Sequence, residues 1–442
     1  MTRTDRPGPV RHGGSIGNGA PAGDVLAPRA AVIVFLSFAL AYFLSALLRA
    51  ITATLSPTLS AEMSLNAGDL GLLAGGYFLG FSLTQLPLGR WLDRHGPKKV
   101  ILAFLSVAVL GCLAFAKAES FQGLLAARVL CGMGVSACLM APLTGYRRWF
   151  DAPTQLRTNS WMLMTGSFGM VAATLPVQWL MPIWGWRALF LMLGAMIAVA
   201  MVLIALLVPR WQTAQAPSAN TPVDDDGSYR EIWRNPYFWR MTPIGFFSYG
   251  GMVAIQTLWA GPWMTQVVGW SAQEAATGLF AINLSMLVSF WLWGLVTPKL
   301  ARRGIHADRL IAWGLPLTFA VLAYLIWRGS SLGDAAAATL ALFCVCSTFV
   351  ALAQPAVGMA FPSHLAGRAL SAYNLVVLSG IFCVQWGIGL VIDLGLAMDL
   401  HPVMAYRVAL MTFAACSVLS WLYFILKRVR PGSAPKPLNP GP

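Results

Sequence analysis

Residues 89–99 read GRWLDRHGPKK, a short charged segment between two long apolar stretches. Each of these stretches is long enough to cross about 30 Å of hydrocarbon as an α-helix. The basic side chains of the segment are clustered around a single acid, Asp93. The segment is therefore predicted to be a loop at one membrane face that joins two spanning helices.

The same kind of apolar stretch recurs along the chain, whose composition is that of a membrane protein. Hydrophobic residues make up 57% of the 442 residues and charged residues 10%, whereas a soluble domain carries about 25% charged residues. A lone strand would leave its amides unpaired in lipid, so each stretch is predicted to be a helix. The predicted spans cover residues 30–54, 67–89, 99–117, 120–146, 158–181, 187–208, 238–267, 273–297, 309–328, 333–361, 369–394 and 403–426. The predicted fold class is all-α: a polytopic membrane protein with twelve transmembrane helices as two six-helix bundles.

A polar, Pro-containing segment with acidic residues at its centre divides these spans six and six. The halves also resemble each other, since Gly89 and Asp93 after the second span match Gly294 and Pro298 after the eighth. The predicted domains are a disordered cytoplasmic arm at 1–28, an N-terminal bundle at 29–208, a cytoplasmic linker at 209–236, a C-terminal bundle at 237–428 and a disordered cytoplasmic tail at 429–442. Duplicated halves joined in this way are typical of a transporter in which one bundle rocks against the other.

The distribution of basic residues orients the predicted helices in the membrane. The formal net charge is +14, and most of the 30 Lys and Arg residues lie in segments on the same membrane face as the N-terminus. This bias predicts that both termini are cytoplasmic, in a multi-pass protein of the bacterial inner membrane. The lipid bilayer therefore accounts for the positive charge, and no nucleic acid partner is predicted. The seven cysteines all lie within predicted spans and are expected to pack there, so neither a metal site nor a cofactor is predicted.

The charged loop and a second motif resemble signatures of the major facilitator superfamily, whose loop signature is Gly-x-x-x-Asp-Arg-x-Gly. The matching residues are Gly89, Asp93, Arg94 and Gly96 in the loop, and Arg128 and Gly132 in RVLCG of the fourth span. The resemblance implies gating or coupling roles for them. Asp93 would latch the two halves together at the inner face, unless the loop charges only set the topology. Arg128 is expected to have a structural or coupling role near the outer end of its span, and the alternative is direct contact with the substrate. The Gly-Pro step typical of drug-proton antiporters is missing from the fifth span, which disfavours multidrug efflux.

Arg49 brings a permanent charge into the first predicted span, where the chain reads YFLSALLRAITATLSP. Tyr42 and Ser45 lie seven and four residues before it, and Thr52 and Ser56 lie three and seven after it, so all share one helix face. A polar stripe around a guanidinium is expected to face an aqueous pathway rather than lipid. The alternative is that Arg49 lies near the outer end of the helix, where its side chain extends to water.

The first span is also similar to that of the organophosphate antiporters and the anion-cation symporters, in which such an arginine holds the anion. This resemblance implies that the span lines a central cavity and that Arg49 binds an anionic substrate. The seventh span lacks the second arginine that the organophosphate antiporters use there. A monoanion such as a carboxylate is therefore predicted.

Import of an anion against an inside-negative potential costs about 2.3 kcal/mol per 100 mV. Anion exchange would offset this cost, and so would symport with a proton bound at Asp69 or Asp393, near the outer ends of the second and eleventh spans. For both aspartates the alternative is the capping of a helix end.

Further polar and aromatic side chains within the spans are predicted to reach the cavity. These are Tyr77, Gln256, Trp259, Asn283, Gln354, Asn374 and Gln385. The alternative for the polar residues is an interhelical hydrogen bond, and for Trp259 it is an interfacial anchor. Gly261 and Pro262 interrupt helical hydrogen bonding in the seventh span, where a bend would close an outer gate.

The predicted function is secondary transport of a small organic monoanion by alternating access, with symport or anion exchange. We expect a monomer whose partners are the anionic substrate and the lipid bilayer. The alternatives are efflux of an amphipathic compound, uptake of a metal or metallophore, and a sensor on the same fold. The sequence shows no Ser-His-Asp set, metal cluster or nucleotide-binding loop, which disfavours an enzyme.

Overall fold

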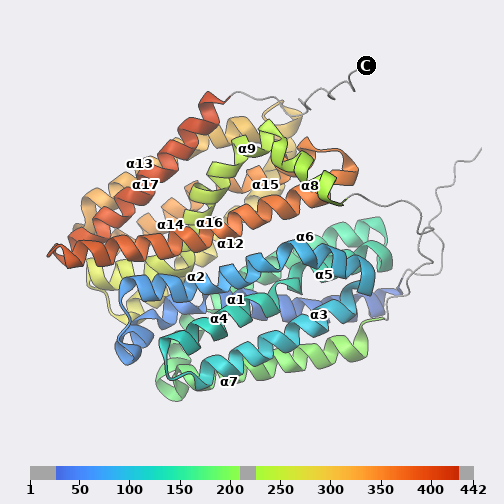
Figure 1. The fold of residues 1–442 in the computed structure, drawn as a ribbon, viewed down its shortest axis with the longest axis horizontal. Coiled ribbons are helices and arrows are strands. Elements are labelled where there is room, and N and C mark those ends of the chain that lie inside the picture. Colours follow the sequence, from blue (N-terminus) through green and yellow to red (C-terminus); the bar gives the residue numbers. More distant parts are fainter. Residues whose placement is uncertain (1–25, 210–224, 428–442) are drawn as a thin grey trace, which may run out of the picture.

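The computed structural model describes residues 26–209 and 225–427, and every regular element in these two ranges is helical. The predicted terminal arm and tail lie almost entirely outside the described residues, as does most of the first half of the predicted linker. Figure 1 shows two groups of helices, with the N-terminal half below and the C-terminal half above.

The N-terminal half contains six spans made of seven helices. Their bounds are α1 Pro28–Met63, α2 Ala67–Leu83, α3 Gln85–Lys117, α4 Phe121–Val135, α5 Ala137–Trp149, α6 Ala152–Ala172 and α7 Leu175–Leu207. The fourth span is α4 followed directly by α5, and the fifth is α6 followed by the first part of α7. The helix α1 continues through Pro57 to Met63, about two turns beyond the predicted end of the first span.

The C-terminal half begins with the amphipathic helix α8 Asp225–Arg234, which occupies part of the predicted linker. The last five spans are built from α12 Ala272–Arg302, α13 Ala307–Arg328, η4 Gly329–Ala335, α14 Ala336–Ser347, η5 Thr348–Leu352, α15 Ala353–Ala360, α16 Ser363–Ala397 and α17 Pro402–Leu426. Within the described ranges, eight helical stretches are long and apolar enough to cross a membrane. This number agrees with twelve spans, because one stretch, Ala307–Ala360, holds two spans and other spans are broken into shorter helices.

The seventh span is the most irregular of the twelve. It alternates between α-helix and π-helix as α9 Pro236–Pro243, η1 Ile244–Tyr249, α10 Gly250–Ala254, η2 Ile255–Trp259, α11 Ala260–Pro262 and η3 Trp263–Val268. A π-helical turn interrupts the regular hydrogen bonding of an α-helix and is frequent at functional sites. The bend predicted at Gly261 and Pro262 therefore lies within a span that is irregular along most of its length.

Two glycines with positive φ mark the turns inside the long helices α3 and α7. Gly96 has φ 77° and Gly185 has φ 69°, values that only glycine adopts without steric cost. Residues 89–99, predicted as a loop, are helical on both sides of Gly96, so the chain turns at a single residue. We call the end of the protein that carries residues 89–99 the basic end and the end that carries residues 64–66 the opposite end.

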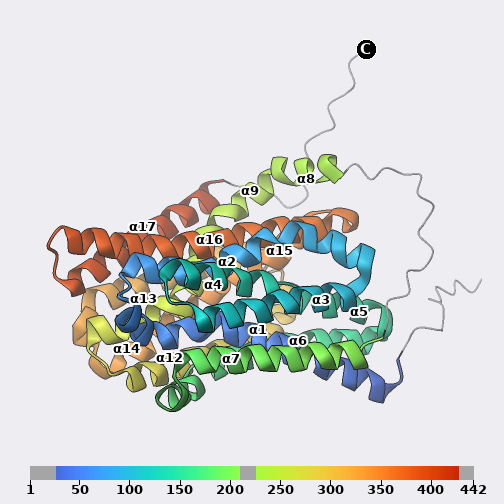
Figure 2. The same cartoon turned by 60° about the horizontal axis from the view of Figure 1, so that its bottom comes forward.

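The two halves meet along α2 and α16, which lie side by side in Figures 1 and 2. A Cβ atom built on Gly71 of α2 would lie 2.5 Å from the backbone oxygen of Gln385 in α16, and one built on Gly75 would lie 2.9 Å from the Phe382 ring. Small residues allow helices in a membrane to approach this closely. Large apolar side chains such as Leu206 and Trp327 remain more than 70% exposed on the outside, as expected of a surface that faces lipid.

Candidate functional site

Arg49 lies well inside α1, far from both of its ends. At 1.5 Å per residue it is about 21 Å from Met63 and about 30 Å from Pro28. The side chain is half-buried, and its Nε atom is buried without a hydrogen-bond partner in the part of the chain that is described. Arg49 therefore does not lie at the outer end of its helix, which the alternative of a side chain extending to water requires.

Side chains from both halves of the protein surround the Arg49 guanidinium. Tyr42, Tyr77 and Tyr249 interact with it electrostatically. Its central carbon lies 5.9 Å from the centre of the Phe81 ring. Tyr249 belongs to the seventh span and the other three residues to the N-terminal half, so Arg49 faces the contact between the halves and not the lipid.

Arg49 has no carboxylate partner among residues 26–209 and 225–427. The ion pairs that the structure describes join Glu62 to Arg187 and Asp308 to Arg240, elsewhere in the molecule. A buried charge without a partner is costly, because the protein interior solvates it less well than water. The Arg49 site can therefore gain stability from any anion that enters it.

The polar stripe around Arg49 is largely buried. Ser45 and Thr52 are 1% and 4% exposed, and the ring of Tyr42 packs against Gly166 of α6. The Ser45 hydroxyl has no hydrogen-bond partner among the described residues. Ser56 differs, because its hydroxyl donates to the backbone oxygen of Ala53 at 2.9 Å and is thus occupied within its own helix.

Arg128 joins α4 to the backbone of α1 beside Arg49. Its Nη1 donates to the backbone oxygen of Leu48 at 2.8 Å, and its Nη2 donates to the backbone oxygen of Arg49 at 3.3 Å. The guanidinium also lies 5.1 Å from the centre of the Tyr77 ring, and only 1% of the residue is exposed. Arg128 thus holds α1, α2 and α4 together, a contact in keeping with the structural or coupling role expected for it.

Gly132 has a packing function in the same region. A Cβ atom built on Gly132 would collide with the backbone of Tyr77, lying 2.7 Å from its carbonyl carbon. The helices α2 and α4 can therefore approach each other only with glycine at this position. Tyr77 is held there by a second contact, since its hydroxyl donates to the backbone oxygen of Ser45 at 3.2 Å.

The amides predicted to bind substrate mostly form hydrogen bonds between helices. Gln256 donates to Asn283 at 3.0 Å, and Asn374 donates to Gln85 of the other half at 2.7 Å. Gln385 donates to Thr257 at 2.9 Å, and its own side-chain oxygen is buried without a partner among the described residues. Gln354 is half-buried at the start of α15. These contacts correspond to the interhelical alternative.

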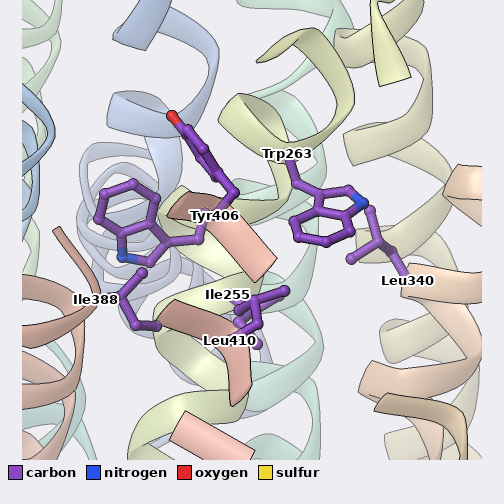
Figure 3. Close-up of a pocket in the computed structure, with 7 residues that line it drawn as sticks. Ile255, Trp263, Leu340, Ile388, Tyr406 and Leu410 are labelled. Atoms are coloured by element: carbon purple, nitrogen blue, oxygen red, sulfur yellow. The ribbon is translucent and has the colours of Figure 1, made fainter. Parts of the chain in front are cut away.

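Trp259 is directed into the packing of the C-terminal half. Its indole N–H donates to the backbone oxygen of Gln385 at 3.0 Å, and its ring meets that of Tyr406 edge-on. Trp259, Tyr406 and Trp263 are among the residues that line a small cavity. Figure 3 shows Tyr406 and Trp263 at this cavity, and the Trp263 indole N–H is buried without a partner among the described residues. The cavity measures about 10 Å³, enough for about one water molecule and far too small for an organic substrate.

The loop signature lies at the basic end, away from Arg49. Asp93, Arg94 and Gly89 are exposed, and Asp93 interacts electrostatically with Arg147 of α5 and with Arg368 of α16. These two arginines belong to different halves. Asp93 thus has the position that a latch between the halves requires, although the structure describes no ion pair for it.

Gly261 and Pro262 lie where the seventh span meets α1. A Cβ atom built on Gly261 would lie 3.0 Å from the backbone oxygen of Ala53, and Pro262 is buried. The close approach of these backbones lies nearer the opposite end than Arg49 does, because Ala53 follows Arg49 by one turn of α1. This contact helps to separate Arg49 from the opposite end.

Three residues beside the predicted site were not predicted from the sequence. Tyr249 and Phe81 line the Arg49 guanidinium, and Gln85 accepts the hydrogen bond of Asn374. The tyrosine within GFFSYGGM is a polar group in an apolar segment and was a usable signal. Nothing in the local sequence distinguishes Phe81 from the many other phenylalanines of the spans.

A helical fold of two six-span halves, with a charged turn after the second span, defines a membrane transporter rather than an enzyme. Residues 38–385 match the Major Facilitator Superfamily, and the chain belongs to this family. A bacterial homologue of the human lysosomal transporter Spinster, solved in an inward-facing and unoccupied conformation, has the same fold. It superposes with a TM-score of 0.73 at 17% sequence identity over 91% of this chain and 98% of the other.

The relatives with a described transport role are distant. The chain is 26% identical to the cis,cis-muconate transport protein of Acinetobacter baylyi, over 57% of this chain and 62% of that protein. It is 28% identical to multidrug resistance protein D of Escherichia coli, over 41% of this chain and 45% of that protein. In both cases the match spans less than two thirds of the relative.

Proposed function

We propose that this transporter moves a small organic monoanion of the carboxylate type, with Arg49 as the charge partner of the anion. The observation that carries the proposal is the half-buried Arg49 guanidinium, which lies between the two halves and lacks a counter-charge among the described residues. An arginine fork matches the geometry of a carboxylate and can bind it through two parallel hydrogen bonds.

The charge of the site favours one negative charge on the substrate. Arg128 is the other buried arginine beside the site, and two of its N–H groups already donate to the backbone oxygens of Leu48 and Arg49. Arg49 is therefore the cation that remains to neutralise a substrate. The Ser45 hydroxyl and the hydroxyls of Tyr42 and Tyr249 supply polar contacts beside it.

The orientation and the energetics of transport belong to the same proposal. The basic end faces the cytoplasm of a bacterium and both termini lie on that side of the inner membrane, because basic segments are retained there. The proposal keeps the predicted domain bounds, with bundles at 29–208 and 237–428. Uptake of an anion then requires compensation of about 2.3 kcal/mol per 100 mV, by symport or by anion exchange.

Counterflow in proteoliposomes tests this function. Vesicles preloaded with unlabelled benzoate, 4-hydroxybenzoate or galacturonate, each a monoanion, would receive the labelled acid outside, for the wild type, Arg49→Lys, Arg49→Ala and the control Arg157→Lys. Arg157 is an exposed arginine of the same half. We expect Arg49→Ala to weaken substrate binding by roughly tenfold or more, since a hydrogen bond to a charged group contributes about 1.5–3 kcal/mol.

Arg49→Lys should lie between Arg49→Ala and the wild type, because an ammonium keeps the charge but loses the fork. Arg157→Lys should transport normally. Wild-type counterflow in both Arg49 variants, with correctly inserted protein, would refute the proposal. Counterflow of amphipathic cations but of no acid would favour the alternative of efflux, to which the likeness to a multidrug resistance protein points.

A further inference from the structure

A groove between α13 and α17 opens on the outer surface of the C-terminal half. Figure 1 shows these helices next to each other, on the side of this half that faces away from the N-terminal half. The groove measures about 770 Å³, within the range of about 300–1,000 Å³ of pockets that hold small organic molecules. Its lining is apolar and includes Phe319, Ala323 and Trp327 of α13 and Met411, Ala415 and Leu419 of α17.

The depth of the groove is close to that of one membrane leaflet. It follows α13 from Phe319 to Trp327, which at 1.5 Å per residue is about 12 Å, whereas the hydrocarbon of one leaflet is about 15 Å thick. Trp421 joins the two helices beyond the inner end, since its indole N–H donates to the backbone oxygen of Ala312 at 3.1 Å. The outer end lies at Trp327, whose exposed ring is typical of the interface between membrane and water. The groove therefore fits an acyl chain of the adjacent leaflet.

Two arginines lie at the interfacial end of the groove. Arg328 directly follows Trp327 on α13. Arg407 lies one turn before Met411 on α17. Nη2 of Arg407 donates to the backbone oxygen of Trp327 at 3.0 Å, and Nη2 of Arg328 donates to the backbone oxygen of Ser331 at 3.0 Å. Both guanidinium groups are therefore held at the turn that follows α13, at the level of lipid headgroups.

Neither arginine has a carboxylate partner among residues 26–209 and 225–427. Both are half-buried, and their Nε atoms are buried without a hydrogen-bond acceptor in the described structure. Asp334, in the same turn, is exposed and forms no ion pair that the structure describes. Two cations held at one turn without a counter-charge attract an anion from outside the chain.

Other carboxylates at the opposite end are engaged with other groups. Glu62 pairs with Arg187, and Asp69 belongs to the capping box of α2. Asp393 accepts two backbone N–H groups of the first turn of α2, at 3.0 Å and 2.7 Å. The Glu274 side chain accepts the backbone N–H at the start of its own helix at 2.8 Å. The contacts of these acids therefore leave both arginines of the groove without a partner.

We propose that the groove binds an acyl chain of an anionic phospholipid whose phosphate is held by Arg328 and Arg407. An arginine fork matches the geometry of a phosphate group. The apolar walls do not select this lipid, because an acyl chain leaves an equally apolar bilayer when it enters the groove. The two positive charges do select, since they favour a lipid with net negative charge over a zwitterionic one. This inference does not depend on the proposed function.

A second copy of the chain is the other candidate occupant. A symmetric dimer formed through the groove would bring the arginines of both copies to the same end of the interface. The residues that line the groove include no carboxylate that could offset their repulsion. The charges therefore favour a phospholipid over a second copy.

Photolabelling of the wild-type protein locates the lipid. The probe is a phosphatidylglycerol with a diazirine on one acyl chain, added to the full-length protein in detergent. We expect cross-links to residues 319–327 and 411–419, with protection by unlabelled phosphatidylglycerol but much weaker protection by phosphatidylcholine and none by inorganic phosphate. Cross-links spread over the whole apolar surface, or equal protection by phosphatidylcholine or by inorganic phosphate, would overturn the proposal. This experiment needs no variant and remains decisive if a variant does not insert.

Native mass spectrometry of lipid adducts measures what each arginine contributes. Arg328→Gln and Arg407→Gln should each weaken phosphatidylglycerol binding by roughly fivefold, and the double variant by roughly 30-fold, while diacylglycerol binding stays the same. The matched control is Lys117→Gln, which removes an exposed cation at the same end of the other half and should bind as the wild type does. Unchanged affinity in the double variant, or an equal loss in Lys117→Gln, would contradict the role of the arginines.

Filling the groove tests the site of the acyl chain. Ala415 is exposed within the groove, so Ala415→Phe occupies the space without entering the core. We expect this variant to lose the cross-links to 411–419, whereas Ala114→Phe, on an exposed position of α3, should keep them. A dimer that dissociates in Ala415→Phe while phosphatidylglycerol binding persists would assign the groove to a second copy and refute the lipid site.

Discussion

Replacement of Gly132 by alanine tests whether the second signature glycine is required for packing. The added methyl group would lie 2.7 Å from the carbonyl carbon of Tyr77 and closer still to its oxygen. Carbon atoms normally lie about 3.5–4.0 Å apart, so α2 and α4 would have to separate by about 1 Å. The obstacle is backbone, and no side-chain rotation can remove it.

The cost of this separation includes more than the clash itself. Overpacking a closely packed core costs about 1–3 kcal/mol. Arg128 lies one turn before Gly132 on α4, so the same shift would lengthen its 2.8 Å bond to the backbone oxygen of Leu48. We therefore expect Gly132→Ala to lower the unfolding free energy by about 2–3 kcal/mol and to weaken transport through the displaced Tyr77.

The measurement is thermal unfolding in detergent, followed with a thiol-reactive fluorophore. Buried cysteines such as Cys131 become reactive only when the helices separate. The matched control is Gly89→Ala, the same substitution at another signature glycine, where an added Cβ atom meets nothing within 4 Å. Gly89→Ala should leave the unfolding temperature unchanged or raise it slightly, since alanine is the better helix former by about 0.5–1 kcal/mol. Equal unfolding temperatures for Gly132→Ala and the wild type would refute the packing argument.

Two further substitutions are expected to change stability in a defined direction. Gly96→Ala should lower the unfolding temperature, because a backbone φ of 77° costs an alanine about 1–2 kcal/mol. The control Gly367→Ala should leave it unchanged, since a Cβ atom built there meets nothing within 4 Å. Equal effects of the two substitutions would contradict the role of the turn at Gly96. Gln256→Leu should lower the unfolding free energy by about 1–3 kcal/mol, because it leaves the buried side-chain oxygen of Asn283 without its hydrogen-bond donor. The double variant Gln256→Leu with Asn283→Leu should lose less unfolding free energy than the sum of the two single variants. Strict additivity in this double-mutant cycle would show that the two amides do not interact.

The positions of the membrane-spanning helices were predicted closely from the sequence, because what a segment needs to cross a membrane is a property of that segment alone. Any backbone in lipid must satisfy its own hydrogen bonds, and about twenty apolar residues are needed to cross the hydrocarbon. The last two predicted spans thus lie within α16 and α17, and each helix extends only a few residues beyond them. The structure differs from the prediction where a single residue sets the local course of the backbone. At Gly96 the chain turns at one residue, where a longer loop was predicted, and α1 continues through Pro57 to Met63.

The surroundings of the predicted site followed from the sequence to a lesser extent than the helices did. The stripe on α1 was predicted from helical periodicity, and in the structure Arg49 lies well inside α1 beside Tyr77. Most of the polar residues predicted in the C-terminal half form hydrogen bonds with other helices. An isolated amide in an apolar helix has the same appearance in the sequence whether it binds a solute or a neighbouring helix.

The sequence alone determined that this is a helical membrane protein of two similar halves, with a permanent charge in its first span, because hydropathy and charge are properties of each segment by itself. Only the tertiary structure decided which groups are partners. Gln85 and Asn374, or Asp393 and the first amides of α2, are hundreds of residues apart in the chain. Their contact depends on how the helices are rotated and how closely their glycines let them approach, and no single segment encodes that arrangement.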